Sequence, residues 1–212
     1  MQIAIPLFDR LTALDAVGPY EVLQRLPEAE VVFCGADPGA VRTENGFLGL
    51  TVERALDDVP HPDVVVVPGG IGSRALTAEH PITRWVREAH GTTRFTTSVC
   101  TGSLVLGAAG LLDGVTATTH WSCYGELEAL GATAVADRVV EHLDRRIITS
   151  AGVSSGIDMA LRLAELLVDR PAAEAMQLMI EYDPQPPFAC GSLTAASPEV
   201  LERVASYSRD KD

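Results

Sequence analysis

Basic residues are scarce in this sequence. Its 212 residues include 16 Lys and Arg against 29 Asp and Glu, which gives a formal net charge of -13 and a pI near 4.7. Binding to nucleic acids and to anionic membrane surfaces depends on clustered basic side chains. We therefore expect neither nucleic acid nor membrane among the partners of this chain.

The sequence also lacks cysteine spacings that bind metals or form redox pairs. The four cysteines, Cys34, Cys100, Cys123 and Cys190, form no CxxC motif. We predict no metal site and no cofactor. Each cysteine is by default a small buried hydrophobic residue, and a reactive role requires a special local setting.

An export signal is not recognisable at the start of the sequence. The segment MQIAIPLFDRLTALD has no basic region, no long apolar run and no small-residue cleavage site. We expect a cytoplasmic protein, in which the cysteines stay reduced.

The length and composition suit one globular domain. The chain is 47% hydrophobic and 21% charged, enough apolar material to offset the entropy of folding. We expect a single domain over residues 1–212, with a C-terminal tail from about residue 183.

Short apolar runs alternate with segments of helical period, as in folds with a parallel sheet. Strands are expected at 2–8, 29–36, 63–67, 94–99 and 115–121, and hairpins at 41–53, turning at Asn45-Gly46, and at 139–152. Helices are expected at 19–26, beginning at Pro19, and at 81–90, 101–112, 123–131, 154–168, 172–182 and 198–208. The run of four valines at 64–67 predicts a central strand buried on both faces.

Cys100 stands between a strand and a helix, a position that exposes a nucleophile at the carboxyl edge of a sheet. Free N–H groups at the start of the next helix, Thr101-Gly102-Ser103, predict a depressed Cys100 pKa. Pro68-Gly69-Gly70 ends a neighbouring strand, and a glycine there could bring its backbone N–H close enough to join that of Thr101 in a two-donor anion hole.

Three motifs together, VVVVPGG, SVCTGS with Cys100 at the turn, and TTHW, resemble the DJ-1/PfpI superfamily over nearly the whole chain. LTALDAVGPYEVL, TSAGVSSGIDMAL and EYDPQPPF are similar to its isocyanide hydratase branch. The resemblance implies a single-domain flavodoxin-like α/β sandwich, with a mostly parallel central sheet, helices on both faces and a nucleophile elbow at Cys100.

The resemblance also implies roles for individual residues. Cys100 becomes the nucleophile, Asp15 the carboxyl group near its sulfur, and Gly70 and Thr101 the backbone donors. Without the resemblance, Asp15 would be interpreted as a solvated loop acid or a helix cap.

A small, uncharged ligand would need an apolar pocket beside Cys100. Candidates for its lining are Gly69, Ile71, His120, Trp121 and Tyr20. Aromatic residues beside a core usually just fill it, and a lone histidine is more often structural than a base.

The predicted function is addition of water to an isocyanide, giving an N-substituted formamide through a Cys100 thioimidate, with Asp15 as general acid and base. The alternatives are another cysteine-dependent activity of the superfamily, glyoxalase-like or deglycase-like, and a redox sensor based on Cys100 oxidation. A peptidase is disfavoured because Thr101 replaces the histidine that follows the cysteine in that branch. A fused DNA-binding regulator is disfavoured by the short sequence after DPQPPF.

Apart from its substrate, the expected partner is a second copy in a homodimer.

Overall fold

The computed structural model describes residues 1–209. The chain divides into two compact units, of which the first is Met1–Ile180 and the second begins at Glu181. This division falls near residue 183, where the sequence predicts the start of a tail. Whether the tail belongs to a single domain stays a prediction.

The first unit is built on a seven-stranded sheet with the order β10-β11-β7-β6-β1-β2-β5. Its strands are β1 (Gln2–Pro6), β2 (Glu30–Gly35), β5 (Arg54–Ala55), β6 (Val64–Val67), β7 (Phe95–Val99), β10 (Val139–His142) and β11 (Ile147–Ser150). All neighbouring pairs are parallel except β10 with β11. The carboxyl ends of the central strands therefore meet at one edge, where open α/β sheets bind ligands.

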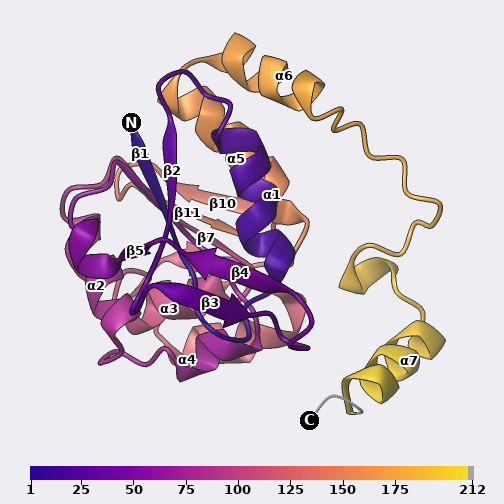
Figure 1. The fold of residues 1–212 in the computed structure, drawn as a ribbon. Helices are drawn as coiled ribbons and strands as arrows, with labels where there is room; N and C mark the ends of the chain where they lie inside the picture. Colours follow the sequence, from indigo (N-terminus) through magenta and orange to yellow (C-terminus); the bar gives the residue numbers. More distant parts are fainter. Residues whose placement is uncertain (210–212) are drawn as a thin grey trace. The chain divides into compact units, whose positions relative to one another are not determined.

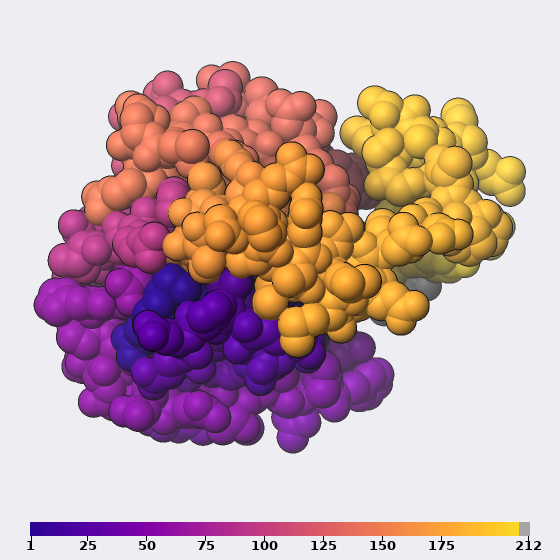
Figure 2. Space-filling model, turned by 90° about the horizontal axis from the view of Figure 1, so that it is seen from above, coloured from indigo at the N-terminus to yellow at the C-terminus, as the bar shows by residue number. Residues whose placement is uncertain are grey.

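Helices cover both faces of this sheet (Figure 1). They are α1 (Ala13–Leu23), α5 (Ser155–Leu167) and α6 (Arg170–Met179) on one face, and α2 (Pro81–His90), α3 (Gly102–Ala108) and α4 (Tyr124–Ala129) on the other. α1 packs against α5, and α6 contacts both, so the orange and indigo segments adjoin in Figure 2. This is the flavodoxin-like α/β sandwich predicted from the sequence.

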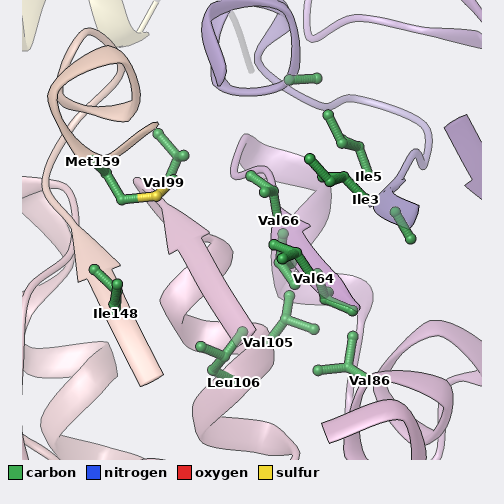
Figure 3. Packing of buried hydrophobic residues seen from close by; sticks show 14 of the residues in the cluster. Ile3, Ile5, Val64, Val66, Val86, Val99, Val105, Leu106, Ile148 and Met159 are labelled. Atoms are coloured by element: carbon green, nitrogen blue, oxygen red, sulfur yellow. The ribbon is translucent and has the colours of Figure 1, made fainter. Parts of the chain in front are cut away.

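Apolar side chains fill the space on both sides of the sheet. Val64 points toward Val86 of α2 and Val105 of α3, whereas Val99 faces Met159 of α5 (Figure 3). All four valines of β6 are fully buried, which confirms their central position. This two-sided burial holds the ends of β6 and β7 rigidly beside each other.

The first helix begins earlier than predicted. α1 starts at Ala13, and Pro19 lies inside the helix. The prediction of a start at Pro19 was wrong because a proline one turn or more into a helix was interpreted as its first residue. Asp15 consequently lies in the first helical turn and not in the preceding loop.

The first hairpin forms, but its turn differs from the prediction. β3 (Gly39–Arg42) pairs antiparallel with β4 (Gly49–Val52), leaving six residues, 43–48, as the connection. Gly46 has a positive φ of 75°, whereas Asn45 does not, so the connection is not the two-residue primed turn. Similarly, the strand expected at 115–121 is reduced to β8 (Thr116–Ala117), which pairs with β9 (Thr133–Ala134).

The second unit contains a short 3₁₀ helix, η4 (Leu193–Ala195), and α7 (Pro198–Arg209). Among residues 1–209, no helix combines the length and the apolar character needed to cross a membrane.

Candidate active site

Cys100 forms a sharp elbow between β7 and α3. Its φ is +57°, in the left-handed region that non-glycine residues rarely adopt. The strained conformation is held by the Cys100 N–H, which donates to Ser150 O and Ala151 O at 3.1 and 3.0 Å. A Cβ at Gly102 would overlap Val67 O, so only glycine lets α3 start so close to β6. These contacts place the side chain at the carboxyl edge, where it is 5% exposed.

Asp15 faces this elbow from the first turn of α1. It is 0% exposed, and its Oδ2 accepts a hydrogen bond from Gly69 N–H at 3.0 Å. Its other carboxyl oxygen, Oδ1, is buried and has no hydrogen-bond partner among residues 1–209. The Cys100 thiol interacts with the carboxyl group and lowers its pKa. The structure thus brings Asp15 and Cys100 together, as the resemblance implies.

Burial dominates the protonation of both groups. It raises the pKa of Asp15 to about 7, against the lowering effects of Gly69 N–H and the thiol. Burial and then the charge of Asp15 raise the pKa of Cys100 to about 12. The sequence prediction of a depressed Cys100 pKa is therefore wrong, because it weighed the free N–H groups and not the loss of solvent. Near neutral pH the pair therefore holds a thiol beside a carboxyl group that is partly protonated and partly ionised.

Two backbone N–H groups do favour the thiolate, although they do not outweigh burial. They belong to Val153 and Thr101, and each hydrogen-bonds to the Cys100 sulfur and lowers its pKa. Val153 was missed in the sequence. It follows β11, which runs parallel to β7 with Ser150 beside Val99, so strand adjacency could have placed this loop next to Cys100.

The loop that follows β6 supplies three consecutive N–H groups to three side chains. Gly69 N–H binds Asp15, Gly70 N–H donates to Thr101 Oγ1 at 2.8 Å, and Ile71 N–H donates to Glu44 Oε1 at 2.9 Å. Thr101 Oγ1 also donates to Gly70 O at 3.0 Å. The Gly70 N–H is thus engaged by Thr101, and its predicted part in an anion hole stays a prediction.

Glycine is required at position 69 of this loop. A Cβ there would lie 2.5 Å from Thr101 N and 2.9 Å from Asp15 Oδ2. Glu44, by contrast, was not singled out in the sequence, because nothing in the hairpin indicates that its side chain reaches the loop after β6.

His120 and Trp121 form an aromatic pair after β8, with ring centroids 5.2 Å apart. His120 Nδ1 accepts from Ser122 N–H at 3.4 Å and lies 2.7 Å from Ser122 Oγ. Burial lowers the His120 pKa, so its ring is neutral near pH 7. The ring also packs on Gly152, where a Cβ would lie 2.6 Å from His120 Cδ2, and it therefore borders the loop that holds Val153.

The remaining candidates differ in their surroundings. Ile71 is half-buried in the loop after β6, whereas Tyr20 packs its ring on Phe33 of β2 at a centroid distance of 5.4 Å. That contact is one of ordinary core packing, and the pocket roles of both residues stay predictions.

A second thiol lies near the site. Buried Cys123 accepts a hydrogen bond from Arg74 Nη2 at 3.1 Å, and the same guanidinium pairs with Glu126 at 2.8 Å. Cys123 acts electrostatically on Cys100 and raises its pKa. Over residues 1–209, no cluster of three or more His, Cys, Asp or Glu is arranged to hold a metal ion.

A mostly parallel sheet, a strained cysteine elbow and a buried carboxyl group beside the thiol define a class of protein. Residues 1–166 match the DJ-1/PfpI family, and the chain belongs to that family.

Within the family, the chain is 43% identical over 204 residues to the isonitrile hydratase of Pseudomonas putida, a match that covers 96% of this chain and 88% of the relative. A crystal structure of a THiJ/PfpI family protein from Pseudomonas syringae has a TM-score of 0.90 at 35% identity, covering 100% of this chain and 88% of that one. The HTH-type transcriptional regulator GbdR of Pseudomonas aeruginosa is 32% identical over 83% of this chain, which spans 48% of the regulator.

Proposed function

We propose that this chain is an enzyme that hydrates isonitriles, compounds of the form R–N≡C, to N-substituted formamides. The observation that carries the proposal is the buried pair of Cys100 and Asp15 on a strained elbow. The extent of the similarity to an isonitrile hydratase supports it.

The first half of the reaction joins the sulfur to the substrate. Asp15, ionised in part because its pKa is near 7, takes the proton of the Cys100 thiol while the sulfur attacks the terminal isonitrile carbon. The same proton then passes from Asp15 to that carbon, and a thioimidate, R–N=CH–S–Cys100, results. The N–H groups of Val153 and Thr101 stabilise the negative charge that develops on the sulfur.

The second half releases the product. Asp15, again a carboxylate, takes a proton from water as the water oxygen attacks the thioimidate carbon. Asp15 passes that proton to the substrate nitrogen. The C–S bond then breaks as the remaining proton of the former water moves through Asp15 to the sulfur, so the formamide R–NH–CHO leaves, Cys100 regains its thiol and Asp15 is a carboxylate again. The sum is R–N≡C plus H₂O, and one carboxyl group serves as base and acid because its pKa is near neutrality.

The test is formamide production from a simple alkyl or aryl isonitrile. The unaltered protein should turn over, whereas Cys100→Ala and Asp15→Asn should not. Cys190→Ala is the matched control, because Cys190 is an exposed thiol outside the first unit. An inactive but folded unaltered protein, or an active Cys100→Ala variant, would refute the proposal.

The alternative of a redox sensor has less support. A sensor thiol is exposed and has a low pKa, whereas Cys100 is buried and its pKa is raised. Another cysteine-dependent activity of the family, glyoxalase-like or deglycase-like, would use the same pair and is separated from hydration by assaying the corresponding carbonyl substrates.

We also propose a cytoplasmic homodimer. Leu178 and Met179 of α6 are exposed, as are Phe188 and Tyr207 in the second unit, and such apolar surface is typical of subunit interfaces. Sedimentation of the unaltered protein and of Leu178→Glu tests this, since a monomer in the unaltered protein would exclude the dimer.

A further inference from the structure

The hairpin of β3 and β4 is tied to the loops that carry the site. Arg42 N–H donates to Asp9 Oδ1 at 2.9 Å, and Glu44 N–H donates to Leu11 O at 3.2 Å. Thr12 N–H in turn donates to Gly69 O at 2.9 Å. The hairpin, the loop before α1 and the loop after β6 therefore form one hydrogen-bonded layer at the carboxyl edge.

Glu44 is the acidic side chain through which the hairpin enters this layer. Its carboxylate accepts from Ile71 N–H, immediately after the two N–H groups that bind Asp15 and Thr101. A shift of the Ile71 amide would move its neighbours in the chain, so the Glu44 contact fixes the position from which Gly69 holds Asp15. The Glu44 side chain is exposed, which means that its substitution leaves the core untouched.

The charge of Glu44 acts on the same groups. Its negative charge raises the pKa of Asp15 and that of His120. The other titratable groups at this edge include Cys100 on the elbow, His120 after β8, Cys123, and Arg74, whose charge is paired with Glu126. Asp9, Arg10 and Arg42 belong to the same hydrogen-bonded layer. Glu44 is thus the nearby carboxylate that opposes ionisation of Asp15.

We propose that Glu44 is a positioning residue of this site, which holds the loop at Gly69–Ile71 with its carboxylate and brings a negative charge to the side of the loop where Asp15 is bound. The inference rests on the proposed hydration reaction. The hydrogen bond described for the Glu44 carboxylate goes to Ile71 N–H, and not to the Cys100 sulfur or to the Asp15 carboxyl group. Glu44 therefore acts indirectly, through the position of the loop and through the electrostatic effect of its charge.

Two substitutions separate the hydrogen bond from the charge. Glu44→Gln removes the charge and retains an oxygen that can accept from Ile71 N–H, whereas Glu44→Ala removes both. Glu88→Gln is the control, because Glu88 is an exposed carboxylate on α2, outside the site.

The charge is measured from the pH profile of turnover. The acidic limb of the profile is the part on which turnover rises as Asp15 ionises. In both Glu44 variants this limb should move to lower pH by roughly half a unit, a modest shift because Glu44 is exposed and its field is screened. High salt should move the limb of the unaltered protein in the same direction, and Glu88→Gln should not move it. An unmoved limb in Glu44→Gln, or an equal movement in Glu88→Gln, would overturn the role of the charge.

The hydrogen bond is measured from kcat at the optimum pH. Glu44→Gln should stay within about twofold of the unaltered protein, and Glu44→Ala should lose about tenfold in kcat with little change in KM, because the loop is no longer held in place. Equal kcat values for the two variants would overturn the positioning role.

A readout without turnover keeps the inference separate from the proposed function. The rate of Cys100 alkylation by iodoacetamide, followed by mass spectrometry, should show a step where Asp15 titrates, because the two groups interact. That step should move to lower pH in Glu44→Gln. If no isonitrile is hydrated but the step moves, the reaction is wrong and the role of Glu44 stands; if the step stays, the effect of Glu44 on Asp15 is refuted.

Discussion

Cys34 and Cys100 are both buried thiols, and burial raises the pKa of each to about 12. Cys34 lies within β2, beside Pro6 of β1, and its carbonyl accepts from Leu7 N–H. Cys100 follows β7 in a strained conformation, faces Asp15, and interacts with the N–H groups of Val153 and Thr101. Low exposure and a high pKa are therefore common to both thiols, whereas of the two Cys100 alone has a carboxyl group acting on its sulfur. Under the proposed reaction, this proton acceptor is what distinguishes the reactive thiol from the structural one.

The largest difference between the two thiols should appear in turnover when each sulfur is removed in turn. Cys100→Ala should lower turnover of an isonitrile by about a thousandfold or more, since the covalent step is lost. Cys34→Ala should leave kcat within about twofold. Steady-state kinetics of the two folded variants measures this contrast, and a comparable loss in both would show that a neighbouring carboxyl group does not distinguish the two thiols.

Removing the carboxyl group should change how stability depends on pH. The Asp15 pKa rises from 3.8 to about 7 on folding, so the folded protein keeps a proton that the unfolded chain loses between these values. The contribution of Asp15 to stability is therefore full below pH 3.8, is lost as pH rises toward 7, and is absent above it.

Asp15→Asn has no such loss and should be more stable than the unaltered protein at pH 8, by an amount that approaches about 4 kcal/mol at most. The difference should shrink near pH 4. Urea unfolding at the two pH values measures it, and a difference that does not depend on pH would contradict the raised pKa.

Thr101 and Thr97 offer a matched pair of buried hydroxyl groups. Thr97 Oγ1 donates to Val65 O at 3.0 Å inside the sheet, as Thr101 Oγ1 does to Gly70 O at the site. Thr97→Val and Thr101→Val should each cost about 1–3 kcal/mol of stability, because a buried backbone group loses its partner. Only Thr101→Val should also lower kcat, by about tenfold, since Gly70 N–H loses its acceptor. Equal kinetic losses would show that Thr101 serves the fold alone.

The smallest effect is expected for Cys34→Ala on stability. The side chain is fully buried, and the loss of one sulfur atom from a packed core costs about 1–2 kcal/mol. Thermal unfolding measures it. No change in stability would indicate that the surrounding strands close the space, which would weaken the interpretation of Cys34 as a packing residue.

Most of the fold could be predicted from the sequence because its signals are local. The valines at 64–67 and the helix at Pro81–His90 appear where their patterns indicate. The start of α1 could not, because Pro19 is compatible with both a first turn and an interior position, and the contacts with α5 decide between them. Tertiary packing overrode the local signal there.

The site was predictable where the chain is contiguous or a family motif covers it. Cys100 and Thr101 follow from the strand and helix that meet at the elbow, and Asp15 came from the resemblance alone. Val153 and Glu44 were missed because their roles depend on which loops adjoin at the edge of the sheet. The Cys100 pKa was wrong for a related reason, because burial is a property of the whole fold.

The strained φ at Cys100 has a consequence for how this protein tolerates change. Cys100→Gly would relax the left-handed conformation, since glycine adopts it without steric penalty. The substitution that the backbone accepts most easily at this position therefore removes the thiol on which the proposed reaction depends. Selection for stability alone would favour loss of the strained cysteine. A screen for more stable variants of this protein therefore has to measure turnover as well as melting temperature.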